Sequence, residues 1–246
     1  MTGAGTVDDA EIAKFGAMAA EWWDPAGKFR PLHEMNPCRM GYIAEQAAAE
    51  FGRDLRTRAP FAGLAAVDVG CGGGLAAEPL ARLGASVTGL DMAGESLDIA
   101  RAHAAASGLE IDYRLESAEA AAARGARFDL VIALEIVEHV ADVPAFLDAL
   151  SALAKPGGMV ILSTLNRTPE SFAAAIVGAE WLLRWLPKGT HDWRKFPTPK
   201  ELEAALGLAG LEVVDAKGMA PDPMRGGWRL VESLRVNYLM TAVKPG

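Results

Sequence analysis

The sequence from Val67 to Gly74 reads VDVGCGGG, a short apolar segment with one acid that runs into four glycines among five residues. Such a segment is typical of a buried strand that ends in a tight turn, because glycine tolerates positive φ and lets a ligand approach the backbone closely. A second apolar segment, residues 87–90, is followed by Asp91, whose carboxylate can accept hydrogen bonds from both hydroxyls of a ribose. Together they predict a nucleoside cofactor across the carboxyl ends of parallel strands.

The glycine spacing separates two kinds of nucleoside cofactor. The dinucleotide fingerprint G-x-G-x-x-G/A opens directly after the strand; counted from Gly70 it fails at Leu75, and counted from Gly72 it begins late. The pattern that fits from the strand outward is D-x-G-x-G-x-G, formed by Asp68, Gly70, Gly72 and Gly74. This pattern resembles motif I of the class I S-adenosylmethionine-dependent methyltransferases. In that family the acid contributes to the polar site around the methionine amino group, and the glycines make room for the cofactor.

Composition limits the classes of function. A chain of 246 residues with 51% hydrophobic and 23% charged residues can form one large domain with an ample core. The net charge of −8 argues against an extended phosphate-binding surface, so no nucleic-acid partner is expected. Cys38 and Cys71 lie far apart, which predicts neither a disulfide framework nor a zinc cage. With no leader and no membrane-spanning apolar run, we expect a cytoplasmic protein.

The order of apolar segments predicts the fold class. Strands are expected at 65–69, 86–90, 111–115, 128–133 and 159–163, and helices at 75–83, 95–107, 119–124 and 143–153. This alternation predicts right-handed βαβ units, and hence an α/β fold with a mostly parallel sheet and helices on both faces. Two later segments, 211–214 and 238–243, are also expected to be strands. The resemblance to class I methyltransferases implies that they complete a seven-stranded Rossmann-like sheet whose last strand is antiparallel.

Two additions to this single domain are expected. N-terminal cap helices fall within about residues 8–60: a helix over 8–23, a proline-punctuated loop at 31–39 and a helix from about 40 to 51. An insertion at about 164–199 contains a segment, 170–186, that would be apolar almost all round as a helix. Such a helix is buried in the core, binds an apolar ligand or touches a membrane. Its tryptophans and the following Lys188 and Arg194 favour a membrane interface.

Chemistry is expected after the strand at 128–133. If a helix begins near Glu135, then Glu135, Glu138 and His139 lie on one face at i, i+3 and i+4. Two carboxylates and an imidazole suit Mg²⁺, Mn²⁺ or Zn²⁺, although acids at helix starts also serve as simple caps. A general base, His139 or His191, could activate the methyl acceptor instead. The N/D-P-P-Y/F loop of DNA-base and glutamine-amide methylases is missing here, which disfavours that class.

Longer motifs identify a narrower resemblance, which covers nearly the whole chain. The sequence is similar to the bacterial ubiquinone-biosynthesis O-methyltransferases. The segments that carry the resemblance are 11–15, 21–24, 28–33, 36–39, 41–45, 88–91, 135–140, 163–167, 187–192, 195–196 and 236–238. The resemblance implies that Arg39, Gly70, Asp91 and Leu134 contact S-adenosylmethionine, with Ser117 a weaker candidate near the adenine. It also raises the expectation of a divalent ion at the 135–139 triplet.

The resemblance also implies a substrate and a location. The substrate would be a polyprenylated phenol or quinol, methylated on oxygen in both O-methylation steps of ubiquinone biosynthesis. Segment 170–194 would contact anionic membrane lipids, which would place a cytoplasmic protein peripherally at the inner face of the membrane. Other ubiquinone-biosynthesis proteins would be further partners. The alternatives are a methyltransferase acting on a soluble small molecule, a non-catalytic cofactor-binding partner and, more distantly, a nicotinamide dehydrogenase.

Overall fold

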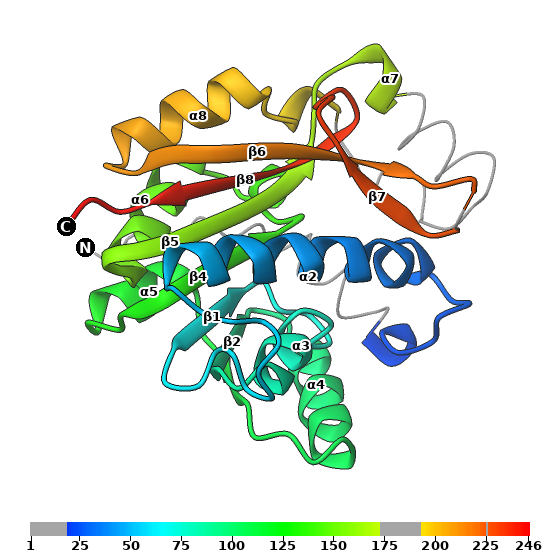
Figure 1. The fold of residues 1–246 in the computed structure, drawn as a ribbon, viewed down its shortest axis with the longest axis vertical. Helices are drawn as coiled ribbons and strands as arrows, with labels where there is room; N and C mark the ends of the chain where they lie inside the picture. The colour runs from blue at the N-terminus through cyan, green and yellow to red at the C-terminus, as the bar shows by residue number, and fades with distance from the viewer. Residues whose placement is uncertain (1–18, 173–192, 225) are drawn as a thin grey trace.

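The computed structural model describes residues 19–172, 193–224 and 226–246 (Figure 1). These residues contain one eight-stranded sheet in the order β3-β2-β1-β4-β5-β8-β6-β7. The strands are β1 Ala65–Val69, β2 Ser86–Asp91, β3 Asp112–Leu115, β4 Phe128–Leu134, β5 Ala154–Leu165, β6 Glu212–Pro221, β7 Trp228–Val231 and β8 Asn237–Val243. The helices are η1 Ala19–Glu21, α2 Arg30–Glu50, α3 Ala77–Arg82, α4 Gly94–Ala106, α5 Ala118–Ala123, η2 Val137–His139, α6 Val143–Leu153, α7 Pro169–Ser171, η4 Trp193–Lys195 and α8 Pro199–Leu208.

The strand pairing confirms the predicted fold class. Strands β1 to β5 pair with one another in parallel, as strands joined by crossover helices do. Strand β8 lies between β5 and β6 and is antiparallel to both. The described sheet has one strand more than the seven predicted, because β7 forms an antiparallel hairpin with the end of β6. Its four residues, Trp228–Val231, are too few to give a clear alternating pattern in the sequence.

Each face of the sheet carries its own core, since successive strand residues point to opposite faces. On one face, Met159 and Ile161 of β5 join a buried cluster with residues of α2, α3 and α4. On the other face, Val160 and Leu162 join a cluster with residues of α5, α6 and α8. Helices therefore cover both faces, as predicted, and the carboxyl ends of β1, β2 and β4 meet at one edge of the sheet (Figure 1).

Segment 31–39 is helical, so the prediction of a loop there was wrong. Pro31 lies in the first turn of α2, where a missing N–H costs little, and Pro37 lies inside the helix. Tertiary contacts hold the helix despite the second proline. The hydroxyl of Tyr42, for example, donates a hydrogen bond to the carboxylate of Asp215 on β6 at 2.8 Å. The helix lies along the sheet, and its first turns lie near the edge where the carboxyl ends of β1, β2 and β4 meet (Figure 1).

Parts of the two predicted additions fall outside the described residues. Of the expected helix over 8–23, the structure describes residues 19–23, in which Ala19–Glu21 form a short 3₁₀ helix. Of the apolar segment 170–186, it describes residues 170–172, at the end of α7. His191 and Lys188 also lie outside the described residues, and Arg194 lies in η4. Among the described residues, no helix is long and apolar enough to span a membrane.

Candidate functional site

The glycine loop after β1 is joined to β2 by backbone hydrogen bonds. The amides of Gly70 and Cys71 donate to the carbonyl oxygen of Leu90 at 2.8 and 3.0 Å. The carboxylate of Asp91, at the end of β2, accepts from the amide of Gly72 through one oxygen and from the amide of Ala93 through the other, both at 2.8 Å. Each oxygen retains a second lone pair, so this fixed carboxylate can still accept hydrogen bonds from ribose hydroxyls.

Two side chains lie directly against the loop and explain why it requires glycine. Gly70 and Gly72 have φ values of 71° and 50°, a region that side chains disfavour. A Cβ built on Gly70 would lie 2.9 Å from Ile136, and one built on Gly72 would lie 2.3 Å from the ring of Trp22. Trp22 in turn stacks on Phe29, with 3.8 Å between ring centroids. The loop is therefore bounded by the N-terminal part of the chain and by the segment after β4.

Beside the loop, two buried charged groups of opposite sign lack full hydrogen bonding. Oδ2 of Asp68 has no hydrogen-bond partner among the described residues, and neither has Nε of Arg39. Burial raises the pKa of Asp68 to about 7; Asp91 adds to this rise and Arg39 opposes it. Burial lowers the pKa of Arg39, while the carboxylates of Glu135 and Asp68 oppose that shift. Leaving polar atoms of charged groups without partners in the interior is costly, so these two side chains are suited to a ligand with one ammonium and one carboxylate.

The amino-acid end of S-adenosylmethionine has this pair of charges. A guanidinium can bind a carboxylate through two parallel hydrogen bonds, and a carboxylate can accept from an ammonium. The adenosyl end carries the ribose that the Asp91 carboxylate suits. The residues present therefore fit this cofactor at three of the positions predicted from the sequence: Arg39, Asp68 and Asp91.

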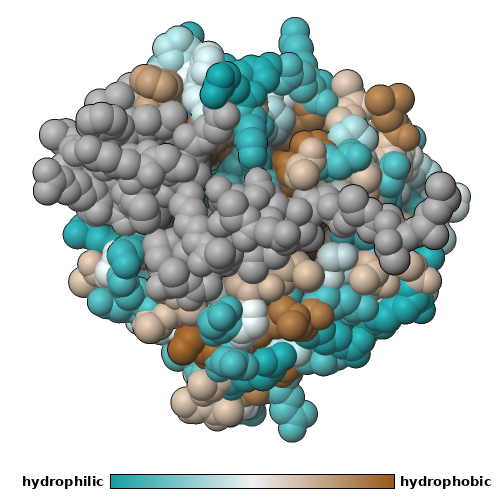
Figure 2. All heavy atoms as spheres, turned by 180° about the vertical axis from the view of Figure 1, so that it is seen from behind, coloured by the Kyte–Doolittle hydropathy of each residue, from teal (hydrophilic) through white to brown (hydrophobic). Residues whose placement is uncertain are grey.

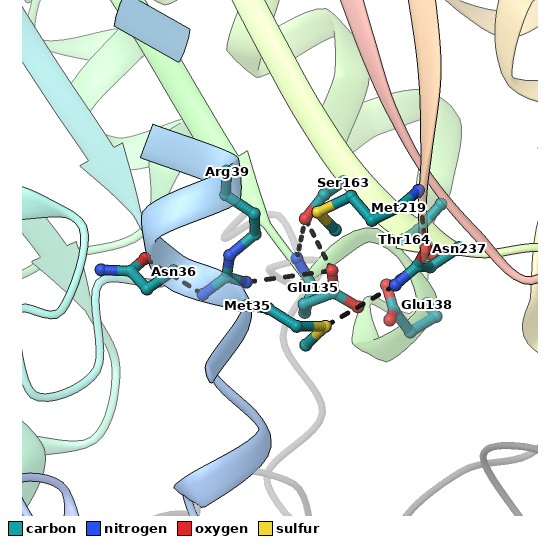
Figure 3. A network of polar contacts seen from close by, with 9 residues as sticks. All are labelled: Met35, Asn36, Arg39, Glu135, Glu138, Ser163, Thr164, Met219 and Asn237. Atoms are coloured by element: carbon teal, nitrogen blue, oxygen red, sulfur yellow. Dashed lines mark hydrogen bonds and ion pairs between the residues drawn. The ribbon is translucent and has the colours of Figure 1, made fainter. Parts of the chain in front are cut away.

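The predicted helix at Glu135 is not formed, and the acidic triplet is arranged differently. Glu135 has a φ of 54°, the only positive value at a non-glycine residue in the described chain, and only Val137–His139 form a short 3₁₀ helix. Figure 3 shows the contacts that hold the two acids. Oγ of Ser163 donates to Oε1 of Glu135 at 2.7 Å, and Oγ1 of Thr164 donates to Oε2 of Glu138 at 2.9 Å.

Ser163 and Thr164 belong to different faces of the sheet. Ser163 follows Met159 and Ile161 at two-residue spacing and so faces α2, whereas Thr164 follows Val160 and Leu162 and faces the α6 side. The two carboxylates are thus held from opposite faces. Among residues 19–172, 193–224 and 226–246, no three His, Cys, Asp or Glu side chains form a group that could hold one metal ion. In this arrangement the triplet does not fit a single divalent ion.

Glu138 nevertheless lies in an unusual setting. Its side chain is 3% exposed, and its Oε1 has no hydrogen-bond partner among the described residues. Burial raises the pKa of Glu138, the neighbouring Glu135 carboxylate adds to the rise and His139 opposes it. A buried acid of this kind is typical of a functional site, although structural networks produce such shifts as well.

Of the other predicted site residues, Leu134, Ser117 and His139 follow the carboxyl ends of strands or end one. Leu134 ends β4 and is partly buried. Ser117 is the N-cap of α5, where its side chain accepts a hydrogen bond from the amide of Ala120 at 3.2 Å. His139 lies in η2, and His191 is outside the described residues. The sequence analysis did not predict the roles of Trp22, Ile136, Ser163 and Thr164. The run of glycines indicated that another group lies close to the loop backbone, but it did not identify Trp22 and Ile136 as the residues that do so.

Comparison with known proteins places the chain among O-methyltransferases. It is 58% identical over 246 residues to the ubiquinone biosynthesis O-methyltransferase of Cereibacter sphaeroides, covering 100% of both chains. It is 61% identical over 241 residues to the protein of the same name from Dinoroseobacter shibae, covering 98% of this chain and 97% of the relative. The chain belongs to the ubiquinone biosynthesis O-methyltransferase family. A family model described as a methyltransferase domain matches residues 42–216 of this S-adenosylmethionine-dependent methyltransferase.

Solved structures agree on the fold of the methyltransferase. The magnesium protoporphyrin IX methyltransferase of Synechocystis PCC 6803, solved with bound SAH, aligns with a TM-score of 0.63 at 18% identity. The alignment covers 96% of this chain and 100% of that chain. A second structure of the same enzyme, with bound SAM, gives a TM-score of 0.60 at 19% identity. At such identities the likeness shows the class I methyltransferase fold alone.

Proposed function

We propose that this methyltransferase transfers the methyl group of S-adenosylmethionine to hydroxyl oxygens of polyprenylated phenol and catechol intermediates, in both O-methylation steps of ubiquinone biosynthesis. The observation that carries the proposal is 58% identity over the full length of both chains to a relative named for this pathway. The buried atoms Oδ2 of Asp68 and Nε of Arg39, which have no hydrogen-bond partner among the described residues, support the choice of cofactor.

Each cofactor-facing residue has a distinct task in this proposal. Bound S-adenosylmethionine supplies an electrophilic methyl group on a sulfonium. Arg39 binds its carboxylate, Asp68 binds its ammonium group and Asp91 binds its ribose. Trp22 and Ile136, which lie against the glycine loop, exclude water from the same region. Holding the methyl donor in line with the attacking oxygen accounts for much of the rate enhancement that such an enzyme needs.

The acceptor hydroxyl must also lose a proton. A phenol titrates near pH 10, so ionising it near neutral pH costs about 3–4 kcal/mol. We propose a histidine base, His139 or His191, for this step; His139 follows the carboxyl end of β4 and His191 belongs to the insertion. The arrangement of Glu135, Glu138 and His139 does not fit one divalent ion, so no step here uses a metal.

The proposed location is peripheral, on the cytoplasmic face of the membrane, with segment 170–194 in contact with anionic lipids. Other ubiquinone-biosynthesis proteins are the further partners in this proposal. The apolar sequence of this segment supports the proposal. Phe172 and Met224 are among the exposed large apolar side chains of the described residues, and Figure 2 shows separate apolar patches on the described part of one face. A prenyl chain gains about 0.8 kcal/mol for each CH₂ group that leaves water.

The decisive experiment measures methyl transfer from labelled S-adenosylmethionine to a short-chain demethylubiquinol and, separately, to a short-chain 2-polyprenyl-6-hydroxyphenol. We expect labelled product from both acceptors. Turnover of one acceptor only would overturn the proposal of both steps. S-adenosylmethionine binding without turnover of either acceptor would indicate a methyltransferase that acts on a different compound.

A further inference from the structure

Glu135 has a backbone conformation that its neighbours must maintain. Its φ of 54° lies in the left-handed region, which a residue with a side chain occupies at an energetic cost. Three hydrogen bonds link it to one residue of β5. The amide of Glu135 donates to the carbonyl oxygen of Ser163 at 2.9 Å and to its Oγ at 3.2 Å, and the same hydroxyl donates to Oε1 of Glu135 at 2.7 Å. Ser163 is fully buried, so these bonds are shielded from water.

The carboxylate held in this way lies next to the guanidinium of Arg39. Oε1 of Glu135, which accepts the hydrogen bond from Ser163, lies 3.9 Å from Nη1 of Arg39 (Figure 3). Nη2 of Arg39 donates to Oδ1 of Asn36, one turn earlier on α2, at 3.3 Å. The guanidinium is therefore bounded by Asn36 on one side and by Glu135 on the other, while its Nε lacks a partner among the described residues.

We infer that Ser163 is a positioning residue for the cofactor: it keeps Glu135 in the left-handed conformation, and the Glu135 carboxylate holds Arg39 toward the amino-acid end of S-adenosylmethionine. This inference rests on the proposed role of Arg39 in binding the cofactor carboxylate. In this inference the function of Glu135 is to orient Arg39, the arginine that binds the cofactor. Ser163 and Glu135 touch neither the methyl group nor the acceptor in this role.

The next residue of β5 provides a matched control. Thr164 is as buried as Ser163 and also donates to a carboxylate, but its partner is Glu138 on the other face of the sheet. Thr164→Val removes that hydrogen bond at nearly constant volume. Ser163→Ala removes both hydrogen bonds that the Ser163 hydroxyl makes with Glu135 and keeps the bond from the Glu135 amide to the backbone carbonyl of residue 163. The two variants therefore differ in one respect: Ser163→Ala affects the carboxylate that lies beside Arg39, and Thr164→Val affects a carboxylate on the other face of the sheet.

The test compares two ligands by isothermal titration calorimetry. S-adenosylhomocysteine has the amino-acid end, whereas 5′-methylthioadenosine shares the adenosine and the thioether but lacks the carboxylate and the ammonium group. We expect Ser163→Ala to weaken S-adenosylhomocysteine binding roughly tenfold, as the loss of a hydrogen bond to a charged group does, and to leave methylthioadenosine binding within about twofold. Thr164→Val should change neither affinity by more than about twofold.

One further variant and two contrary outcomes complete the test. Glu135→Gln keeps an acceptor for Ser163 but removes the charge beside Arg39, so it should show the same selective loss. Equal weakening of both ligands by Ser163→Ala would indicate general distortion of the site and would overturn the inference, as would unchanged S-adenosylhomocysteine binding. Because only binding is measured, the result does not depend on which phenol is methylated, and failure of the proposed function would be seen separately in the turnover assay.

Discussion

The indole nitrogen of Trp23 donates a hydrogen bond to the carbonyl oxygen of Gly73 at 2.9 Å. The same indole stacks on the imidazole of His103, with 3.4 Å between ring centroids and 6° between planes. Nδ1 of His103 lies 2.5 Å from Oε1 of Glu78, a carboxylate that is almost fully buried. The N-terminal part of the chain, the glycine loop, α3 and α4 are thus joined at a single point beside the candidate cofactor site.

Trp23→Phe should weaken both the fold and cofactor binding. Phenylalanine keeps most of the stacking area but loses the bond to Gly73, which costs about 1 kcal/mol of unfolding free energy. Because Gly73 belongs to the glycine loop, we expect S-adenosylhomocysteine affinity to fall several-fold in calorimetry. Trp193→Phe, which removes an indole bond to the carbonyl of Thr168 instead, is the control. An equal loss of affinity in both variants would show that the hydrogen bond between Trp23 and Gly73 has no specific effect on cofactor binding.

Gly72→Ala should be far more damaging than Gly52→Ala. Both glycines have positive φ, at 50° and 61°, so both substitutions carry a similar backbone cost of about 1 kcal/mol. At Gly72, however, the new methyl group would lie 2.3 Å from Trp22, whereas at Gly52 it would meet nothing within 4 Å. Urea denaturation should show an additional loss of about 1–3 kcal/mol for Gly72→Ala, with cofactor binding abolished. Similar stabilities of the two variants would show that Trp22 moves aside freely.

Asp68→Asn should stabilise the cofactor-free protein at alkaline pH and weaken cofactor binding. The pKa of Asp68 is raised to about 7, so the folded protein holds a proton that the unfolded chain releases near pH 4. This contribution to stability is fully present below about pH 4 and is lost as pH rises through about 7, by about 1.36 kcal/mol for each pKa unit. The melting-temperature advantage of Asp68→Asn should therefore be larger at pH 8 than at pH 5. A melting-temperature difference that does not change with pH would show that ionisation of Asp68 is not the cause of the stabilisation.

Mg²⁺ should leave the melting temperature of the cofactor-free protein unchanged. The carboxylates of Glu135 and Glu138 are bound by Ser163 and Thr164 from opposite faces of the sheet, so no site is preformed for one ion. A ligand that binds the folded state raises the melting temperature, which makes thermal scans with millimolar Mg²⁺ or with EDTA a direct measurement. A rise with Mg²⁺ that is lost in Glu138→Gln would show that the two acids come together around the ion.

Local patterns were sufficient where neighbouring residues determine the structure. The strand Ala65–Val69 and the helix Val143–Leu153 have the predicted bounds, because apolar runs and turn residues mark both ends. The positions of Asp68 and Asp91 also followed from sequence, since parallel strands bring their carboxyl ends to one edge.

Long-range contacts account for what the sequence did not predict. The first half of α2 contains two prolines and reads as a loop, yet contacts of the helix with distant strands, such as that of Tyr42 with Asp215, hold it in helical form. The carboxylates of Glu135 and Glu138 are bound by residues on opposite faces of β5, Ser163 and Thr164. The spacing of residues within 135–139 contains no information about which face of β5 supplies each hydrogen bond.

The place of β8 in the sheet determines the order in which the chain can fold during synthesis. Strand β6 leaves the ribosome before β8, yet it reaches β5 only through β8, which lies between them. Until residues 237–243 emerge, the edge of β5 has no strand partner on that side and the hairpin of β6 and β7 has no sheet to join. The half of the sheet that carries the glycine loop can therefore form first, and the second half closes onto it in a late step that a nascent-chain protease assay would detect.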